Sequence, residues 1–110
     1  MTLKSTESAA IRGGVPVCFP WFANHPSDAT KPAHGFARTR MWQAADVTRD
    51  DAGDTRVTLR LTSDAETRAY WNAEFTASLT VSLGLSLAMT FDVENTGADD
   101  IAYELALHTY

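Results

Sequence analysis

A regular alternation of apolar and polar side chains, in three stretches between residues 56 and 94, constrains the fold of this 110-residue chain most strongly. Successive side chains of a β-strand point to opposite faces, so a period of two places all the apolar residues on one face. The pattern predicts an all-β fold of antiparallel strands with one dry face and one solvent-facing side. The alternating apolar residues are Val57, Leu59 and Leu61, then Phe75, Ala77, Leu79, Val81 and Leu83, and then Leu85, Leu87, Met89, Phe91 and Val93.

Turn-forming residues separate these predicted strands. Residues 50–54 precede the first strand, Gly84 lies between the second and third, and residues 95–97 follow the third. Apolar residues occupy odd positions on both sides of Gly84, so the numbers of two opposed residues must add up to an even number. A three-residue loop at 83–85 satisfies this condition, with Gly84 supplying a positive φ. Residues 64–72 are expected to form a helical turn or a loop.

The segment at 12–40 is irregular and holds all four prolines of the chain, together with four aromatic residues. Proline lacks a backbone donor, so this segment can be neither a regular helix nor a central strand. We expect a long packed loop with one short strand at 15–19. Residues 101–110 are expected to form a strand, and the sequence ends partway along it. In that strand His108 faces away from Leu105 and Leu107.

Composition excludes several classes of protein. A hydrophobic content of 45% and a charged content of 21% are typical of one globular domain and argue against disorder. No apolar run approaches the length of about 20 residues that a membrane span needs, and residues 1–7 contain no apolar core of a secretory signal. The single cysteine, Cys18, cannot form an internal disulfide and is expected to be a small buried hydrophobe. A cytoplasmic location fits these features.

The net charge of −5 is unevenly distributed. Residues 1–40 carry five basic and two acidic side chains, a net charge of +3, whereas residues 41–110 carry four basic and twelve acidic ones, a net charge of −8. An acidic chain binds polyanions poorly, so nucleic acid is not an expected partner. The basic cluster could hold a small anion, although chance alone would also produce such an asymmetry.

Few residues suggest chemistry on their own. Of the three histidines, His25 lies in a polar loop and is expected to be solvated, and His34 and His108 taken singly are more often structural than catalytic. No paired cysteines or histidines have the spacing of a metal site, so none is expected. Arg12 is followed by two glycines, which would suit close approach to a phosphate or diol. A tight turn with a surface arginine explains the same run.

Four motifs occur in a suitable order and spacing. They are Ala10-Ile11-Arg12-Gly13-Gly14-Val15-Pro16-Val17-Cys18-Phe19-Pro20-Trp21-Phe22, then Pro32-Ala33-His34-Gly35-Phe36-Ala37-Arg38, then Met41-Trp42, and then Ala106-Leu107-His108-Thr109-Tyr110. Together they resemble the glucose-6-phosphate 1-epimerase branch of the aldose epimerase family. The resemblance implies a partial antiparallel β-sandwich, a galactose mutarotase-like supersandwich, with an open cleft on one sheet.

The resemblance also implies roles for individual residues. His108 matches the general acid at the ring oxygen, and His34 matches a second cleft histidine that holds and polarises the sugar. Arg12 and Arg38 match arginines that bind the substrate, with its phosphate as their target. The family's general base, a glutamate, and a substrate-binding aspartate lie downstream of Tyr110. Residues 1–110 are therefore expected to be a central fragment of one domain, without its N-terminal strands and C-terminal half.

Two positions depart from the family pattern. Ala33 stands where a polar residue, commonly glutamine, is frequent, which puts one sugar contact in question. Ala23 follows Trp21-Phe22 where glycine is frequent, a change that we expect to matter little.

The implied activity is interconversion of the α and β anomers of glucose 6-phosphate or a related aldohexose 6-phosphate. A base takes the proton of the anomeric hydroxyl while an acid protonates the ring oxygen, and the roles reverse after rotation about C1–C2. Nothing is oxidised, so we expect no cofactor and no metal, with a small hexose phosphate as partner and a monomer when intact. Two alternatives remain: a non-catalytic carbohydrate-binding module, and an inactive truncated fragment that lacks the base.

Overall fold

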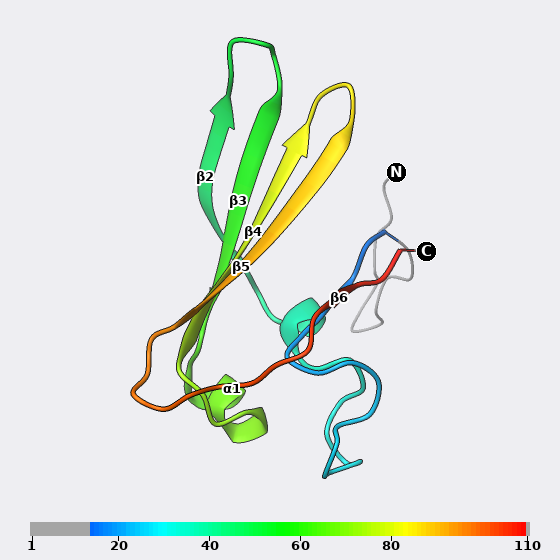
Figure 1. Ribbon diagram of the computed structural model, residues 1–110, viewed down its shortest axis with the longest axis vertical. Coiled ribbons are helices and arrows are strands. Elements are labelled where there is room, and N and C mark those ends of the chain that lie inside the picture. Colours follow the sequence, from blue (N-terminus) through cyan, green and yellow to red (C-terminus); the bar gives the residue numbers. More distant parts are fainter. Residues whose placement is uncertain (1–13, 110) are drawn as a thin grey trace. The chain divides into compact units, whose positions relative to one another are not determined.

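The computed structural model describes residues 14–109 (Figure 1). These residues divide into two compact units, one of residues 14–38 with 104–109 and the other of Thr39–Tyr103. The larger unit is a sheet of four antiparallel strands in the order β2-β3-β4-β5. Its strands are β2 (Gln43–Arg49), β3 (Thr55–Thr62), β4 (Phe75–Leu83) and β5 (Leu87–Asn95). The prediction of antiparallel strands is confirmed for the three alternating stretches, and the turns at 50–54 and 95–97 lie where they were expected.

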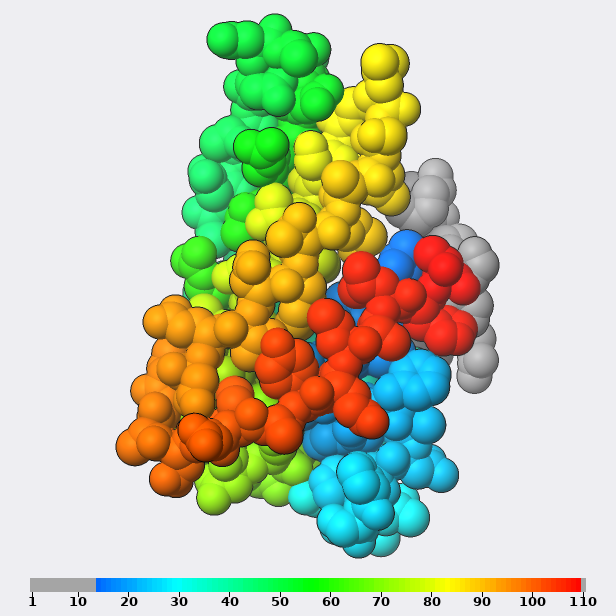
Figure 2. Space-filling view, viewed as in Figure 1, coloured from blue at the N-terminus to red at the C-terminus, as the bar shows by residue number. Residues whose placement is uncertain are grey.

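The apolar side of this sheet is dry over only part of its length. Phe75, Ala77 and Leu79 of β4 are buried, as is Leu61, which pairs with Ala77 across the β3–β4 ladder. The Trp71 ring packs against that of Phe75 at this buried end, with the ring centroids 5.3 Å apart. Toward the hairpin turn, the prediction of a dry face is wrong, because Leu83 and Leu87 are 51% and 57% exposed. In Figure 2 the β2–β3 and β4–β5 turns, green and yellow, lie at the same end of this unit.

The β4–β5 turn has the predicted length but is displaced by one residue. Leu83 pairs with Leu87, so the loop consists of Gly84, Leu85 and Ser86 rather than residues 83–85. The even sum of opposed residues is retained. Gly84 does not adopt a positive φ. A Cβ at this position would meet the carboxylate of Asp54, which would have to move away, and the displacement leaves Leu85 fully exposed at the tip.

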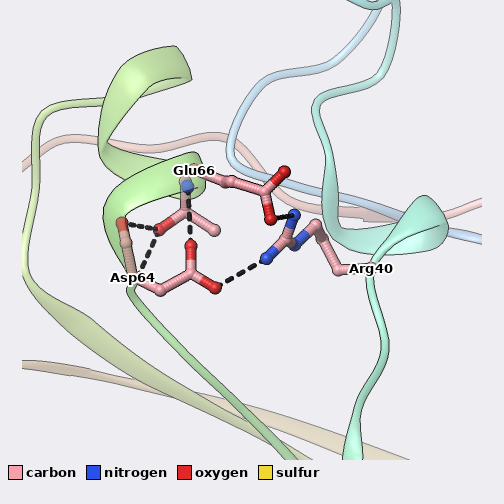
Figure 3. A network of polar contacts seen from close by, with 4 residues as sticks. Arg40, Asp64 and Glu66 are labelled. Carbon is pink, nitrogen blue, oxygen red and sulfur yellow. Dashed lines mark hydrogen bonds and ion pairs between the residues drawn. The ribbon is translucent and has the colours of Figure 1, made fainter.

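The expected helical turn is confirmed as α1 (Ala65–Tyr70), which begins in a capping box. Asp64 Oδ1 accepts a hydrogen bond of 2.9 Å from the Thr67 N–H, and Thr67 Oγ1 accepts one of 2.8 Å from the Asp64 N–H. The Arg40 guanidinium spans this cap, donating to Asp64 Oδ2 at 2.6 Å and to Glu66 Oε1 at 3.1 Å (Figure 3). The hydrogen bond from Thr67, aided by the charge of Arg40, lowers the pKa of the Asp64 carboxyl below its ordinary value.

Asp64 makes the stability of this unit depend on pH. Asp64→Asn keeps an acceptor for the Thr67 N–H but loses the charge facing Arg40, whereas Asp64→Ala loses both, so thermal unfolding should rank wild type above Asn above Ala at pH 7. The folded-state pKa lies below the unfolded value of 3.8, so the carboxylate stabilises the fold above pH 3.8. This contribution is lost as the pH falls through the folded-state pKa, and the wild-type and Asn curves should then converge. A constant gap down to pH 2, or an equal gap for Asp51→Asn in the β2–β3 turn, would contradict this explanation.

The smaller unit pairs two segments that are far apart in the sequence. β1 (Val17–Cys18) runs antiparallel to β6 (Ala106–Leu107), shorter than the strands predicted at 15–19 and 101–110. Backbone hydrogen bonds extend the same register on both sides, from the Glu104 N–H to the Pro20 carbonyl at 2.7 Å and from the His108 N–H to the Pro16 carbonyl at 3.0 Å. The core of this unit contains Val17, Cys18, Phe19, Trp21, Phe36 and Ala37. The expected burial of Cys18 is confirmed, and burial raises the pKa of its thiol.

Candidate active site

The two histidines singled out from the sequence lie beside each other in the smaller unit. The ring centroids of His34 and His108 are 6.2 Å apart, and the ring planes are inclined by 40°. His34 belongs to the loop that precedes the 3-10 helix η1 (Ala37–Thr39), and His108 directly follows β6. His34 is half-buried and His108 is exposed, so one imidazole is set into the surface and the other lies on it.

Phe22 and Ala23 fix the His34 ring. The ring Nδ1 accepts a hydrogen bond of 3.0 Å from the Ala23 N–H, and the backbone N–H of His34 donates to the Ala23 carbonyl at 2.8 Å. The Phe22 ring lies against the imidazole, with centroids 4.8 Å apart. Because Nδ1 accepts a hydrogen bond, neutral His34 carries its proton on Nε2, which is then a donor for an oxygen of a ligand.

The backbone beside His34 is held in an uncommon conformation. His34 and Gly35 have φ values of 65° and 72°, in the left-handed region. The Phe19 N–H donates to the His34 carbonyl at 3.2 Å, and the Phe19 carbonyl accepts from the Phe36 N–H at 3.0 Å. A Cβ on Gly35 would collide with that carbonyl. Strained residues persist only where their surroundings enforce the conformation, and they cluster at functional sites.

The two arginines differ in what the structure describes. Arg38 lies in η1 with an exposed side chain, and its Nη2 donates to the carbonyl of Ala33, the residue before His34, at 3.3 Å. Arg12 lies outside the described residues. The structure therefore brings His34 and His108 together and ties Arg38 to the His34 loop.

His25 is not the solvated residue that its polar surroundings predicted. Its ring packs edge-on against Trp21, with centroids 4.6 Å apart, and its Nδ1 accepts from the backbone N–H groups of Ser27 and Asp28 at 3.1 and 3.0 Å. Trp21 Nε1 donates to the Pro32 carbonyl at 2.8 Å, which closes the same loop. We assign His25 a structural role.

Phe22 and Glu104 belong to the candidate site but were not predicted as site residues. Glu104 Oε1 accepts a hydrogen bond of 2.9 Å from the Phe22 N–H. The sequence offered one signal for Glu104, since alternation places it on the same strand face as His108. Within residues 14–109, no three histidine, cysteine, aspartate or glutamate side chains lie close enough to hold a metal ion. The described helices include none with the length and apolarity to cross a membrane.

Ala23, expected to be a neutral departure from glycine, has a φ of 60°. A left-handed conformation strains any residue with a Cβ, so Ala23→Gly should raise the free energy of unfolding by about 0.5–1 kcal/mol despite the added freedom of the unfolded chain. Denaturant unfolding would measure the change. Ala52→Gly in the β2–β3 turn is the control, because Ala52 has no positive φ and should lose about 0.5 kcal/mol. A loss at both positions would show that Ala23 is not strained.

Comparison with known proteins shows which family this chain resembles. The family model for aldose 1-epimerase matches residues 5–110. The chain is 39% identical over 104 residues to an Escherichia coli (strain K12) protein named "Putative glucose-6-phosphate 1-epimerase", covering 94% of this chain and 33% of that protein. A Salmonella typhimurium protein of the same name is 37% identical over 101 residues, covering 92% and 32%. The chain thus spans about a third of the length of the curated relatives that it matches.

A solved structure extends the similarity to the fold. The crystal structure of a protein described as a "putative mutarotase (YeaD)" from Salmonella typhimurium superposes with a TM-score of 0.74 and 32% identity. The superposition covers 83% of this chain and 30% of that one. The antiparallel strands of this chain accordingly form part of a galactose mutarotase-like fold. With the family match running over nearly all of its residues, the chain belongs to the aldose 1-epimerase family.

Proposed function

We propose that the intact protein is a hexose-6-phosphate mutarotase, which interconverts the α and β anomers of glucose 6-phosphate or a related aldohexose 6-phosphate. In this proposal, residues 1–110 are the central part of a single domain, and the N-terminal strands and the C-terminal half with the general base lie outside them. The observation that carries the proposal is the 6.2 Å separation of the His34 and His108 rings, which come from segments far apart in the sequence. Family membership supports the same reaction class.

Each histidine takes one task in the proposed reaction. His108 protonates the ring oxygen as the C1–O5 bond breaks, while the base removes the proton of the C1 hydroxyl and leaves an open-chain aldehyde. Rotation about C1–C2 and reversal of the two proton transfers close the ring as the other anomer. His34 holds and polarises the sugar through Nε2–H, the donor that its hydrogen bond with Ala23 leaves available. Positioned proton transfer of this kind contributes roughly 10²–10⁴-fold to the rate.

Arg12 and Arg38 are proposed to bind the phosphate of the substrate. A guanidinium fork matches the geometry of phosphate oxygens. The phosphate is remote from C1, so this contact would supply binding energy and orientation rather than proton transfer. Support for Arg38 comes from its hydrogen bond to Ala33, which keeps it on the loop that carries His34. We further propose that the intact protein is a cytoplasmic monomer.

Exchange NMR on the full-length protein tests the reaction and the substrate class together. Addition of the protein should accelerate exchange between the anomeric signals of glucose 6-phosphate far more than those of glucose, because only the former offers a phosphate. Equal acceleration for both sugars would refute phosphate recognition but leave mutarotation in place. Binding without accelerated exchange would identify a carbohydrate-binding module instead of an enzyme.

A further inference from the structure

We propose that Glu104 is a positioning residue of the candidate active site, which holds the backbone that orients His34. This inference rests on the proposed function, because the orientation of His34 matters for catalysis only if the site acts on a sugar. Glu104 contacts no predicted site residue directly. Glu104 acts through the backbone of Phe22 and Ala23. Its two hydrogen bonds to this loop, to Pro20 and Phe22, lie within the smaller unit.

Glu104 holds the loop at residues 20–23 at two points. Its N–H donates to the Pro20 carbonyl at 2.7 Å, and its Oε1 accepts from the Phe22 N–H at 2.9 Å, between residues 82 positions apart. A hydrogen bond to a carboxylate is about twice as strong as one between neutral groups. Within residues 14–109 the Glu104 carboxylate makes no ion pair. The hydrogen-bond partner that the structure shows for this carboxylate is the backbone N–H of Phe22.

The effect reaches His34 through a single residue of backbone. The peptide units that carry the N–H groups of Phe22 and Ala23 are planar and share the Phe22 Cα, so only two dihedral angles separate them. The Ala23 N–H donates to His34 Nδ1 at 3.0 Å, and the Phe22 ring lies 4.8 Å from the imidazole. Fixing the Phe22 N–H therefore limits the movement of the Ala23 N–H and of the Phe22 ring, the two groups that orient the His34 ring.

Strain in this loop explains why an external anchor is needed. Ala23 and His34 have φ values of 60° and 65°, and each conformation is unfavourable for a residue with a Cβ. The two residues hold each other by reciprocal hydrogen bonds, but this pair alone could relax together. Glu104 joins it to the β1–β6 ladder, whose register continues through the Pro20 carbonyl.

The test compares Glu104→Ala with Glu104→Gln in the full-length protein. The glutamine amide oxygen can still accept from the Phe22 N–H, whereas alanine cannot. We expect Glu104→Ala to lower kcat for glucose 6-phosphate anomer exchange by about tenfold or more, with a smaller change in KM, and Glu104→Gln to restore most of the loss. The ¹⁵N shifts of the His34 ring supply a readout besides activity. In wild type and Glu104→Gln the two shifts should differ as expected for a single Nε2–H tautomer. In Glu104→Ala the Nδ1 and Nε2 shifts should approach each other, because the hydrogen bond from Ala23 loosens and both tautomers are populated.

Each outcome of this test is decisive. Unchanged activity in Glu104→Ala would overturn the proposal, as would lower activity with an unchanged His34 spectrum. Glu94→Ala removes a carboxylate from β5 and should leave both readouts at wild-type values. If Glu104→Ala does not fold, Glu104→Met keeps a long side chain without a strong acceptor and takes its place under the same criteria. Should wild type lack mutarotase activity, the proposed function fails, and a ring spectrum that still responds to Glu104→Ala would show that the anchoring of His34 holds.

Discussion

Gly35→Ala is expected to lower the free energy of unfolding by about 3 kcal/mol or more, because it adds a backbone collision to a strained conformation. Gly35 is buried with a φ of 72°, and its missing Cβ would point into the Phe19 carbonyl. That carbonyl cannot move away freely. It accepts hydrogen bonds from the N–H groups of Phe36 and Ala37 at 3.0 and 3.2 Å, and the Phe19 N–H is bound to the His34 carbonyl.

Gly14→Ala separates the collision from the strain. Gly14 has nearly the same φ, 76°, but a Cβ there would meet nothing within 4 Å. This variant should therefore lose only about 1 kcal/mol. Denaturant unfolding of the two variants gives the comparison, and the difference between them is the cost of the collision. Equal losses would mean that the Phe19 carbonyl yields to a methyl group, and that Gly35 is required for its φ alone.

The strands that could be predicted are those whose side chains face two different environments. Except at Leu83, Leu87 and Asn95, β3, β4 and β5 bury or partly bury their odd-numbered side chains, so their alternation is visible in the sequence. β2 exposes every side chain and joins the sheet through its backbone ladder with β3, which leaves no such pattern. The parity argument gave the length of the β4–β5 turn but not its position. That position brings Gly84 against Asp54 of the other hairpin, a contact between residues distant in the sequence.

The candidate site was predictable as a set of motifs but not as a geometry. His34 and His108 were singled out because they stand in family motifs. The β1–β6 ladder places His108, and backbone hydrogen bonds between Phe19 and the residues at 34–36 place His34 beside it. The hydrogen bond that orients the His34 ring comes from the backbone N–H of Ala23, and a backbone hydrogen bond leaves no trace in side-chain identity. His25 was misjudged for a similar reason, since its partners are the N–H groups of Ser27 and Asp28.

His108→Ala is expected to lower the rate of glucose 6-phosphate anomer exchange by about 10²–10⁴-fold in the full-length protein, the range that positioned proton transfer supplies. The variant should fold, because the His108 side chain is exposed and its link to the β1–β6 ladder is a backbone hydrogen bond to Pro16. Thermal unfolding should therefore change little while catalysis is lost. This combination distinguishes a chemical role from a structural one.

The matched control is His25→Ala, which removes an imidazole from the same unit but not from the candidate site. It should weaken the 25–32 segment, where its ring packs against Trp21 and its Nδ1 accepts from the N–H groups of Ser27 and Asp28. It should leave most of the exchange rate intact, because none of these contacts involves Ala23 or His34. Added imidazole should partly restore exchange in His108→Ala, since a free acid can occupy the space left by the side chain, and should not affect His108→Phe, where a ring fills that space. An unchanged exchange rate in His108→Ala would remove His108 from the mechanism. The proton for the ring oxygen would then have to come from another group. His34 would be the next candidate, because its Nδ1 accepts from the Ala23 N–H and the proton of the neutral ring is then on Nε2.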